Sequence, residues 1–368
     1  MSILTLYNSN MVDALNTALA TPHLYTTINL NKICLTSDRL TLLIKFIKVS
    51  TVLKALHCTS DSSFYDQDLA LLADTLKTST TLEDLVLPDN HITSAGAQKL
   101  AELLATNPSI QKLNLWNNNI DLNGAQALAA SLEKNTTLKE LNIGANPLTD
   151  AGIKAILTAL QPHTQLTDLL LNTTHMGTTG IIAVEQFLKT NTSLKALNLA
   201  ANNLQAYDIS VLVDALQKNK TLEALVLRGH TLSEHTLCLL GTALATNRTL
   251  KTLDLQECHI TDQGLANFVH HMNLNGKRPI TLYLNGNHKL TIDGGQVLRE
   301  NPQIEITEHE IQRKLGDLNC LHCLTRIPCA VRFGFVDQPQ APVVNTYAPA
   351  TATMGKIEGD KDNRPKAD

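Results

Sequence analysis

A group of cysteines near the C-terminal end of the chain has residue types that can bind a metal ion. Cys320 and Cys323 flank a Leu-His pair that includes His322, and Cys329 follows. Thiolate and imidazole groups bind zinc, but a structural zinc site normally uses two ligand pairs at a definite spacing, and no standard spacing occurs here. The same cysteines lie among apolar residues with arginines close by, which also suits lipidation. Three interpretations stay open: packing in a C-terminal cap, lipidation, and metal or redox chemistry.

The sequence shows no motif for catalysis or for nucleotide binding. No serine or cysteine lies in a glycine turn with a histidine and an aspartate to support it, and neither common phosphate-binding glycine pattern occurs. We therefore predict that the protein is not an enzyme and needs no cofactor. The formal net charge of -4, the pI near 6.3 and the lack of a clustered basic run argue against nucleic acid as a partner.

Targeting signals are also missing from the sequence. The first residues do not show a basic region followed by an apolar block, and no segment reaches the ~18 uncharged apolar residues that a membrane span needs. The seven cysteines, an odd number without a disulfide-like framework, fit a reducing compartment. The sequence therefore predicts a cytoplasmic protein without a transmembrane segment.

The dominant pattern is a repeat with a period near 28 residues. The stretch LKELNIGANPLTD, at 138–150, has leucine or isoleucine at its first, fourth, sixth and eleventh positions and asparagine at its ninth. A fixed period of this size indicates a stacked array of similar units rather than a globule with one core. Ten such frames, numbered below from their first position, start at Tyr25, Leu53, Leu82, Ile110, Leu138, Leu166, Leu194, Leu222, Leu250 and Pro279.

Each unit is predicted to form a strand, a turn and a helix. Leu141 and Ile143 alternate with outward residues, which is the pattern of a strand with one buried face. The ninth-position side chain can bond the backbone of the turn and of a neighbouring unit. Sequences such as TDAG at 149–152 and TDQG at 261–264 provide helix caps, and an asparagine near each helix end suits a left-handed cap. The ninth position holds Asn90, Asn118, Asn146, Asn202 and Asn287, with Thr174, His230 and Cys258 as substitutes; the helix-end asparagines are Asn107, Asn135, Asn191, Asn219 and Asn247.

The LxxLxLxxNxL frame with its helix resembles the ribonuclease-inhibitor-like class of leucine-rich repeats over roughly residues 25–300. This resemblance implies an α/β solenoid shaped like a horseshoe, with about ten repeats, parallel strands on the concave face and helices on the convex face. We expect a helical N-terminal cap at 1–24, the repeat array at 25–302, a helical C-terminal cap with the cysteine group at 303–335, and a disordered tail at 336–368, where Pro, Ala and Thr dominate.

The outward strand positions are where such an array would contact a partner protein. Most are small or neutral, so the only tryptophan, Trp116, is conspicuous at a seventh position, with Gly144 beside it leaving a predicted hollow. Interface energy concentrates in Trp, Tyr and Arg anchors, and charges at the rim supply complementarity. The candidate contacts are Trp116, Arg228 and Tyr283, with Asn114 and Asn142 between them and Lys112, Glu140, Asp84, Asp168, Asp254 and Glu257 as the charged group.

These observations favour a monomeric, non-enzymatic scaffold that binds a partner protein in its concave face. An alternative is a regulator of a small GTPase, because the Ran GTPase-activating protein is built on similar repeats. A ubiquitin ligase with a catalytic cysteine domain would need more chain than follows the repeats. Similar repeats also occur in proteins that bacteria inject into host cells, so an effector acting in a host cytosol is a further hypothesis.

Overall fold

The computed structural model describes residues 2–31, 33–59, 65–272 and 279–306, all within one compact unit of the chain. The cysteine group, most of the C-terminal cap predicted at 303–335 and the tail predicted at 336–368 therefore lie outside the described residues. In the described part no helix is long and apolar enough to cross a membrane.

Within these residues, strands and helices alternate, and the strands form one parallel sheet whose spatial order equals their order in the chain. This is the α/β solenoid that the repeat predicts. The ten frames are all present as the strands from β2 to β11. The strands are β1 (Ser2–Leu6), β2 (Tyr25–Asn31), β3 (Ala55–Thr59), β4 (Asp84–Val86), β5 (Lys112–Asn114), β6 (Glu140–Asn142), β7 (Asp168–Leu170), β8 (Ala196–Asn198), β9 (Ala224–Val226), β10 (Thr252–Asp254), β11 (Ile280–Tyr283) and β12 (Ile304–Ile306).

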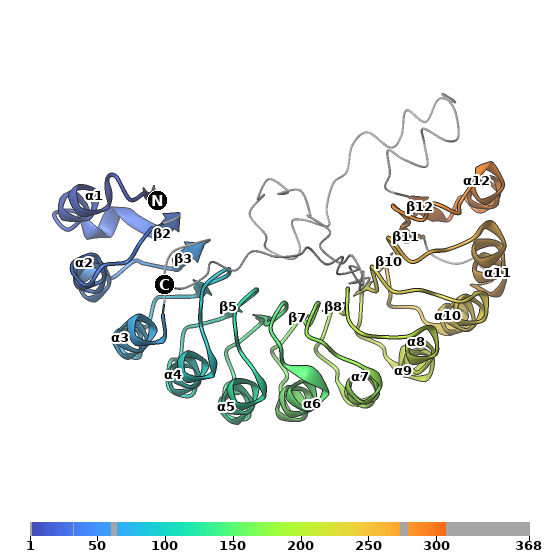
Figure 1. The fold of residues 1–368 in the computed structure, drawn as a ribbon, viewed down its shortest axis with the longest axis horizontal. Coiled ribbons are helices and arrows are strands. Elements are labelled where there is room, and N and C mark those ends of the chain that lie inside the picture. The colour runs from blue at the N-terminus through green and yellow to red at the C-terminus, as the bar shows by residue number, and fades with distance from the viewer. Residues whose placement is uncertain (1, 32, 60–64, 273–278, 307–368) are drawn as a thin grey trace, which may run out of the picture. The chain divides into compact units, whose positions relative to one another are not determined.

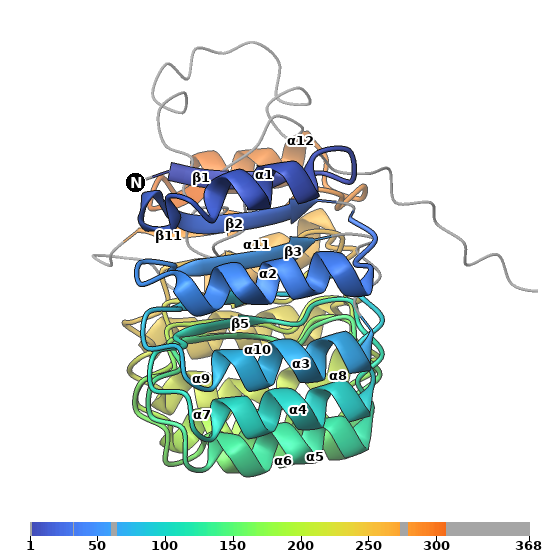
Figure 2. The same ribbon diagram turned by 90° about the vertical axis from the view of Figure 1, so that its left-hand side faces the viewer.

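The helices lie on the outer side of a curved array and the strands on its inner side, as Figures 1 and 2 show. A helix is about twice as wide as the ~4.8 Å spacing of strands, so packing one helix beside each strand bends the sheet. The helices are α1 (Met11–Ala18), the 3-10 turn η1 (Pro22–Leu24), α2 (Ser37–Val49), α3 (Asp66–Leu76), α4 (Ser94–Leu104), α5 (Leu122–Leu132), α6 (Thr149–Leu160), α7 (Thr178–Thr190), α8 (Ala206–Ser210), α9 (Leu212–Lys218), α10 (Glu234–Thr246), α11 (Asp262–Met272) and α12 (Ile292–Arg299).

The two ends of the array extend further than the sequence predicts. Helix α1 is present, but strand β1 precedes it and pairs in parallel with β2, so residues 1–24 do not form a purely helical cap. At the other end, residues 304–306 form β12 at the start of the predicted cap, and the rest of that cap lies outside the described residues. The physical reason is the same at both ends: the first and last repeats leave a free sheet edge, and a short segment with alternating apolar residues gains backbone partners along one of its sides there.

The register of the sheet follows from the constant period. Leu113 pairs with Leu141, which pairs with Leu169, so each fourth-position leucine lies beside its equivalents in the next units. These leucines and the sixth-position residues are fully or almost fully buried between the sheet and the helices. The core is therefore one continuous layer of leucine, isoleucine and alanine, shared by all units.

The ninth-position asparagines form the predicted ladder. Asn146 donates from Nδ2 to the carbonyl oxygens of Leu115, 2.9 Å away in the preceding unit, and Ile143, 3.1 Å away in its own. Its Oδ1 accepts the Ile120 N–H at 3.0 Å. The substitutes keep part of the pattern: Thr174 Oγ1, His230 Nδ1 and Cys258 Sγ each contact a strand-end carbonyl. This ladder ties each turn to its neighbour.

The asparagines at the helix ends form a second ladder, and the predicted left-handed cap is wrong. Asn191, Asn219 and Asn247 follow their helices with φ near -70° and extended ψ values. The Nδ2 group of Asn219 instead donates to the carbonyl of Leu188 at 2.8 Å, and its Oδ1 accepts the N–H of Leu222 at 2.7 Å. Each side chain thereby ties the preceding helix to the start of the next strand, and this bonding requires extended backbone.

Left-handed backbone occurs elsewhere, above all at the eighth position of the third to the tenth unit. Ala145, Thr173 and Ala201 have φ values of 52°, 55° and 50°, a conformation that ordinary residues rarely adopt. The N–H of Ala145 donates to the carbonyl of Asn172 in the next unit at 2.8 Å, and the equivalent bond recurs along the array. Helix starts vary too: Thr261 Oγ1 accepts the Gly264 N–H as the sequence predicts, whereas Thr149 has φ 60° and its helix has no side-chain cap.

Candidate functional site

The outward positions of the strands form three parallel rows on the inner face of the array. Register pairing places Lys112 beside Glu140, and Asn114 beside Asn142. It also places Asp254 beside Tyr283. The predicted contact residues therefore fall into two groups, one on β5 and β6 around Trp116 and one on β9 to β11 with Arg228, separated by about 19 Å along the sheet.

The side chains of the fifth-position row are less exposed to solvent than the sequence suggests. Asn114 and Asn142 are only 7 % and 5 % exposed. The Oδ1 atom of Asn114 accepts the N–H of Trp116 at 3.0 Å, and that of Asn142 accepts the N–H of Gly144 at 3.1 Å. Neighbouring strands on a curved inner face bring these side chains together, so they hold the strand ends and offer little surface to a partner.

The hollow predicted beside Trp116 is filled. A Cβ atom added to Gly144 would lie 2.5 Å from Oδ1 of Asn172 and 2.9 Å from its carbonyl oxygen. The carboxamide of Asn172, from the next unit, thus occupies the space that the missing side chain leaves, and Gly144 is buried. Trp116 itself is half-buried in the seventh-position row, so part of its ring surface is accessible.

Charged side chains surround Lys112 on the third-position row. Its Nζ lies 3.0 Å from Oε2 of Glu140, and the two side chains are 18 % and 34 % exposed. Burial raises the pKa of the Asp84 carboxyl above its usual value, and the positive charge of Lys112 partly offsets this shift. Burial and the same lysine lower the pKa of His57. Lys112 is therefore the central cation of a partly desolvated group with His57, Asp84 and Glu140.

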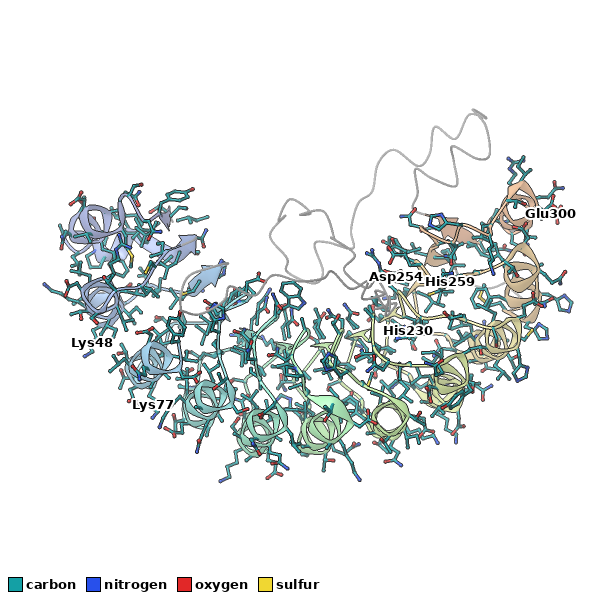
Figure 3. The ribbon with its side chains drawn as sticks, viewed as in Figure 1. Lys48, Lys77, His230, Asp254, His259 and Glu300 are labelled. Atoms are coloured by element: carbon teal, nitrogen blue, oxygen red, sulfur yellow. The ribbon has the colours of Figure 1, made fainter. Side chains whose placement is uncertain are left out.

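The second group contains a more exposed ion pair. Nη2 of Arg228 lies 2.6 Å from Oε1 of Glu257, with side chains 44 % and 53 % exposed, so the pair contributes only about 0–1 kcal/mol to stability. Burial raises the pKa of Asp254, whose Oδ1 accepts the N–H of Gln256 at 2.9 Å. Figure 3 shows Asp254 on the inner side of the array, whereas Lys48 and Lys77 lie on the outer side.

The buried cysteines and His230 have structural roles. Cys58 and Cys258 are fully buried, and burial raises the pKa of Cys258 to about 12 and that of Cys58 further, so neither thiol ionises at neutral pH. His230 is 1 % exposed, and its ring contacts the Leu227 carbonyl and the Asn202 N–H. In the described part of the chain, His, Cys, Asp and Glu side chains do not gather into a group that could hold a metal ion.

Acidification should destabilise the array through its buried histidines. Burial lowers the pKa of His57, His163 and His230. In the unfolded chain the histidine pKa is about 6.5. Below that pH the unfolded chain binds more protons than the folded chain, so the free energy of unfolding falls as the pH falls. Above that pH these histidines are neutral in both states, and the stability they contribute is fully present. His230→Asn, which restores the majority residue of its ladder, should reduce this loss.

The measurement is the thermal midpoint at pH 7.5 and pH 5.5. The exposed His235 supplies the matched control, since His235→Asn should leave the difference between the two midpoints unchanged. An equal pH dependence in His230→Asn and in the unaltered protein would contradict the role of His230.

One comparison with known proteins identifies the repeat. A family model described as Leucine Rich repeat matches residues 78–101, 106–129, 134–157 and 246–269. No curated protein sequence matches the chain.

Similar solved structures include three partial matches. Leiomodin-1 actin-binding site 2 is 22 % identical with a TM-score of 0.33, covering 36 % of this chain and 77 % of that chain. The tropomodulin C-terminal domain of Caenorhabditis elegans is 16 % identical with a TM-score of 0.36, covering 41 % and 93 %. Rad7, in its complex with Elc1 in yeast, is 15 % identical with a TM-score of 0.48, covering 81 % and 78 %.

Proposed function

The chain is a leucine-rich-repeat protein, and we propose that it is a non-enzymatic scaffold that binds a partner protein through the inner face of the array. One observation carries the proposal. The half-buried Trp116 follows β5, the strand that carries Lys112 of the Lys112–Glu140 ion pair, on a face where the neighbouring side chains are small or already bonded. We name Asp84, Lys112, Trp116 and Glu140 the Trp116 patch.

The Trp116 patch combines the two properties of an interface anchor. A tryptophan provides a large apolar surface at little cost in conformational entropy, and such residues carry much of the energy of protein interfaces. Lys112 lies four residues earlier, roughly 13 Å away along the extended chain. It is only 18 % exposed, so it is partly desolvated before any partner arrives. Excess acidic charge next to that lysine favours a partner segment that places a positive or hydrogen-bond donor group near Asp84 and an apolar group against Trp116.

The group on β9 to β11 supports a second contact. Arg228 and Glu257 are both accessible, and Tyr283 is half-buried beside Asp254. A partner that spans the roughly 19 Å between the two groups would contact both. Ion pairs as exposed as this one influence the rate of association and its salt dependence more than affinity. We therefore assign the anchoring role to the Trp116 patch and the orienting role to Arg228.

Affinity capture tests the proposal with matched variants. The full-length chain and its Trp116→Ala and Lys112→Glu variants would be used as baits in a cytosolic lysate, with captured proteins quantified by mass spectrometry. Truncation of an interface tryptophan costs about 2 kcal/mol or more, so Trp116→Ala should reduce capture of a specific partner at least tenfold. Tyr207→Ala removes an aromatic side chain that is 62 % exposed on the outer side, and it should have no effect.

Two outcomes would contradict this assignment. Capture that is unchanged by Trp116→Ala would exclude the Trp116 patch, and capture lost equally with Tyr207→Ala would point to the outer side. Single-turnover GTP hydrolysis, measured on a panel of small GTPases, examines the alternative that the repeat resemblance raises. Acceleration by the full chain would replace the scaffold by a GTPase regulator.

A further inference from the structure

Strand β1 leaves an unpaired edge at the N-terminal end of the sheet. Its residues Ser2–Leu6 pair with β2 on one side, and within the described residues no strand pairs with the other side. Figure 2 shows β1 and α1 at this end of the array. Edge strands offer a row of free N–H and C=O groups to another chain, and most proteins protect them with charges, prolines or covering segments.

Large apolar side chains are exposed around this edge. Ile3 is 61 % exposed, Tyr7 51 %, Val12 41 % and Leu24 47 %. They come from β1, the turn after it, the first turn of α1 and the turn before β2. The rest of the described chain, although much longer, contributes six more exposed apolar residues of this size, and these are scattered over the helical side: Val49, Tyr65, Leu71, Ile182, Tyr207 and Ile292. The first unit therefore concentrates accessible apolar surface beside a free strand edge.

Charge is almost absent from the same segment. Between residues 2 and 31 the only side chain that is ionised at neutral pH is Asp13, whereas 17 % of the whole chain is charged. The opposite end of the sheet differs. Strand β12 carries the exposed Glu305, Asp293 and Arg299 belong to the helix before it, and Glu300 caps that helix. Only the N-terminal end thus lacks the charges that prevent strand edges from pairing.

We propose that the β1 edge is a homodimer interface, in which two copies pair their first strands antiparallel across a twofold axis. A second copy fits this surface because it brings the same uncharged apolar side chains and its own free edge. A strongly acidic or basic partner would find little to complement, because residues 2–31 carry only Asp13 and the nearby Arg39 is already bonded to Asn8. Antiparallel pairing about a twofold axis lets the free N–H groups of each strand donate to the free C=O groups of the other, and it closes the assembly at two copies.

The proposed interface depends on the presence of strand β1. A helical cap at residues 1–24 predicts a monomer, since it leaves no free backbone groups. Strand β1 changes that expectation, because five residues of unpaired edge and four exposed apolar side chains occur together. The interface lies at the end of the array and leaves the Trp116 patch of each copy uncovered, so it is independent of the partner binding proposed above.

Sedimentation equilibrium on the full chain tests the dimer. We expect a mass near twice 40.1 kDa at about 50 µM, with dissociation on dilution. Ile3→Lys combined with Tyr7→Lys places like charges beside their symmetry mates and should weaken dimerisation at least tenfold. Both side chains are exposed, so thermal unfolding of the variant should remain close to that of the unaltered protein.

The control variant is Ile292→Lys combined with Tyr207→Lys. These side chains are each 62 % exposed, which matches Ile3, but they belong to α12 and α8. The control should remain dimeric, and hydrogen exchange of the β1 amides should be slower at high than at low concentration. A full chain that is monomeric at 100 µM, or a dimer that resists the Ile3→Lys and Tyr7→Lys changes, would overturn the proposal.

Discussion

Replacing Asn146 by alanine should lower the free energy of unfolding by about 2–4 kcal/mol. The side chain is 1 % exposed and bonds to both its own turn and the preceding unit. Its Oδ1 accepts the buried Ile120 N–H at 3.0 Å. Alanine would leave that buried donor unpaired and open a small cavity.

Asn146→Ala should reduce the cooperativity of unfolding more than it reduces the secondary-structure content of the folded protein. Each unit of a solenoid contacts only its neighbours, so a weakened contact in the middle of the array divides it into two blocks. Urea unfolding followed by circular dichroism should show a broader transition, and the Ile120 amide should exchange faster. Asn146→Thr should retain part of the stability, because Thr174 in the equivalent position donates to the Leu171 carbonyl at 2.9 Å.

The matched control is Asn123→Ala. Asn123 is exposed in the first turn of α5, so its replacement should change stability by no more than about 0.5 kcal/mol. If Asn146→Ala were no more destabilising than this control, the ladder would not hold the units together as we describe.

Replacing Gly241 by alanine should destabilise the protein by about 1–3 kcal/mol, although alanine is the better helix former. Gly241 lies within α10, where that helix approaches α11 most closely. An added Cβ atom would lie 2.5 Å from the carbonyl oxygen of Phe268 and 3.2 Å from the backbone nitrogen of Met272. Both are backbone atoms near the end of a helix, so the methyl group can be accepted only if the two helices separate.

Gly177 provides the control for this prediction. A Cβ atom there would lie 3.6 Å from Oδ2 of Asp150, which is ordinary van der Waals contact. Its φ of -119° is open to any residue, so Gly177→Ala should be nearly neutral. Thermal unfolding of both variants measures the difference, and a midpoint for Gly241→Ala equal to that for Gly177→Ala would show that α10 and α11 tolerate separation.

Inter-repeat bonding explains most differences between the predictions and the structure. Within one unit, Asn219 has the position of a left-handed helix cap, yet its amide bonds a carbonyl of the preceding helix and its backbone is extended. Conversely, Ala145 has no sequence signature of a left-handed residue, and it adopts that conformation because its N–H bonds the next unit. In both cases the neighbouring unit supplies a partner that the local sequence does not reveal.

The candidate site shows the same division. The sequence placed Trp116, Lys112 and Glu140 on outward strand positions, and the structure brings Lys112 and Glu140 together on adjacent strands. It could not show that Asn172 fills the space beside Gly144, since that contact depends on how tightly consecutive turns stack. Nor could it show the burial of Asn142, which follows from the crowding of side chains on the inner side of a curved sheet.

The sequence by itself determined the repeating unit: the period, the ten frames, the buried leucines and the ninth-position ladder all follow from apolar spacing within about 28 residues. Only the tertiary structure decided what happens between units and at the ends. Strand β1 illustrates this best, because SILTL at 2–6 lacks the repeat frame and becomes a strand only where β2 offers it a free edge. Local sequence specifies which face of a strand or helix is apolar. The pairing of its backbone groups with other units depends instead on which segment lies beside it in space.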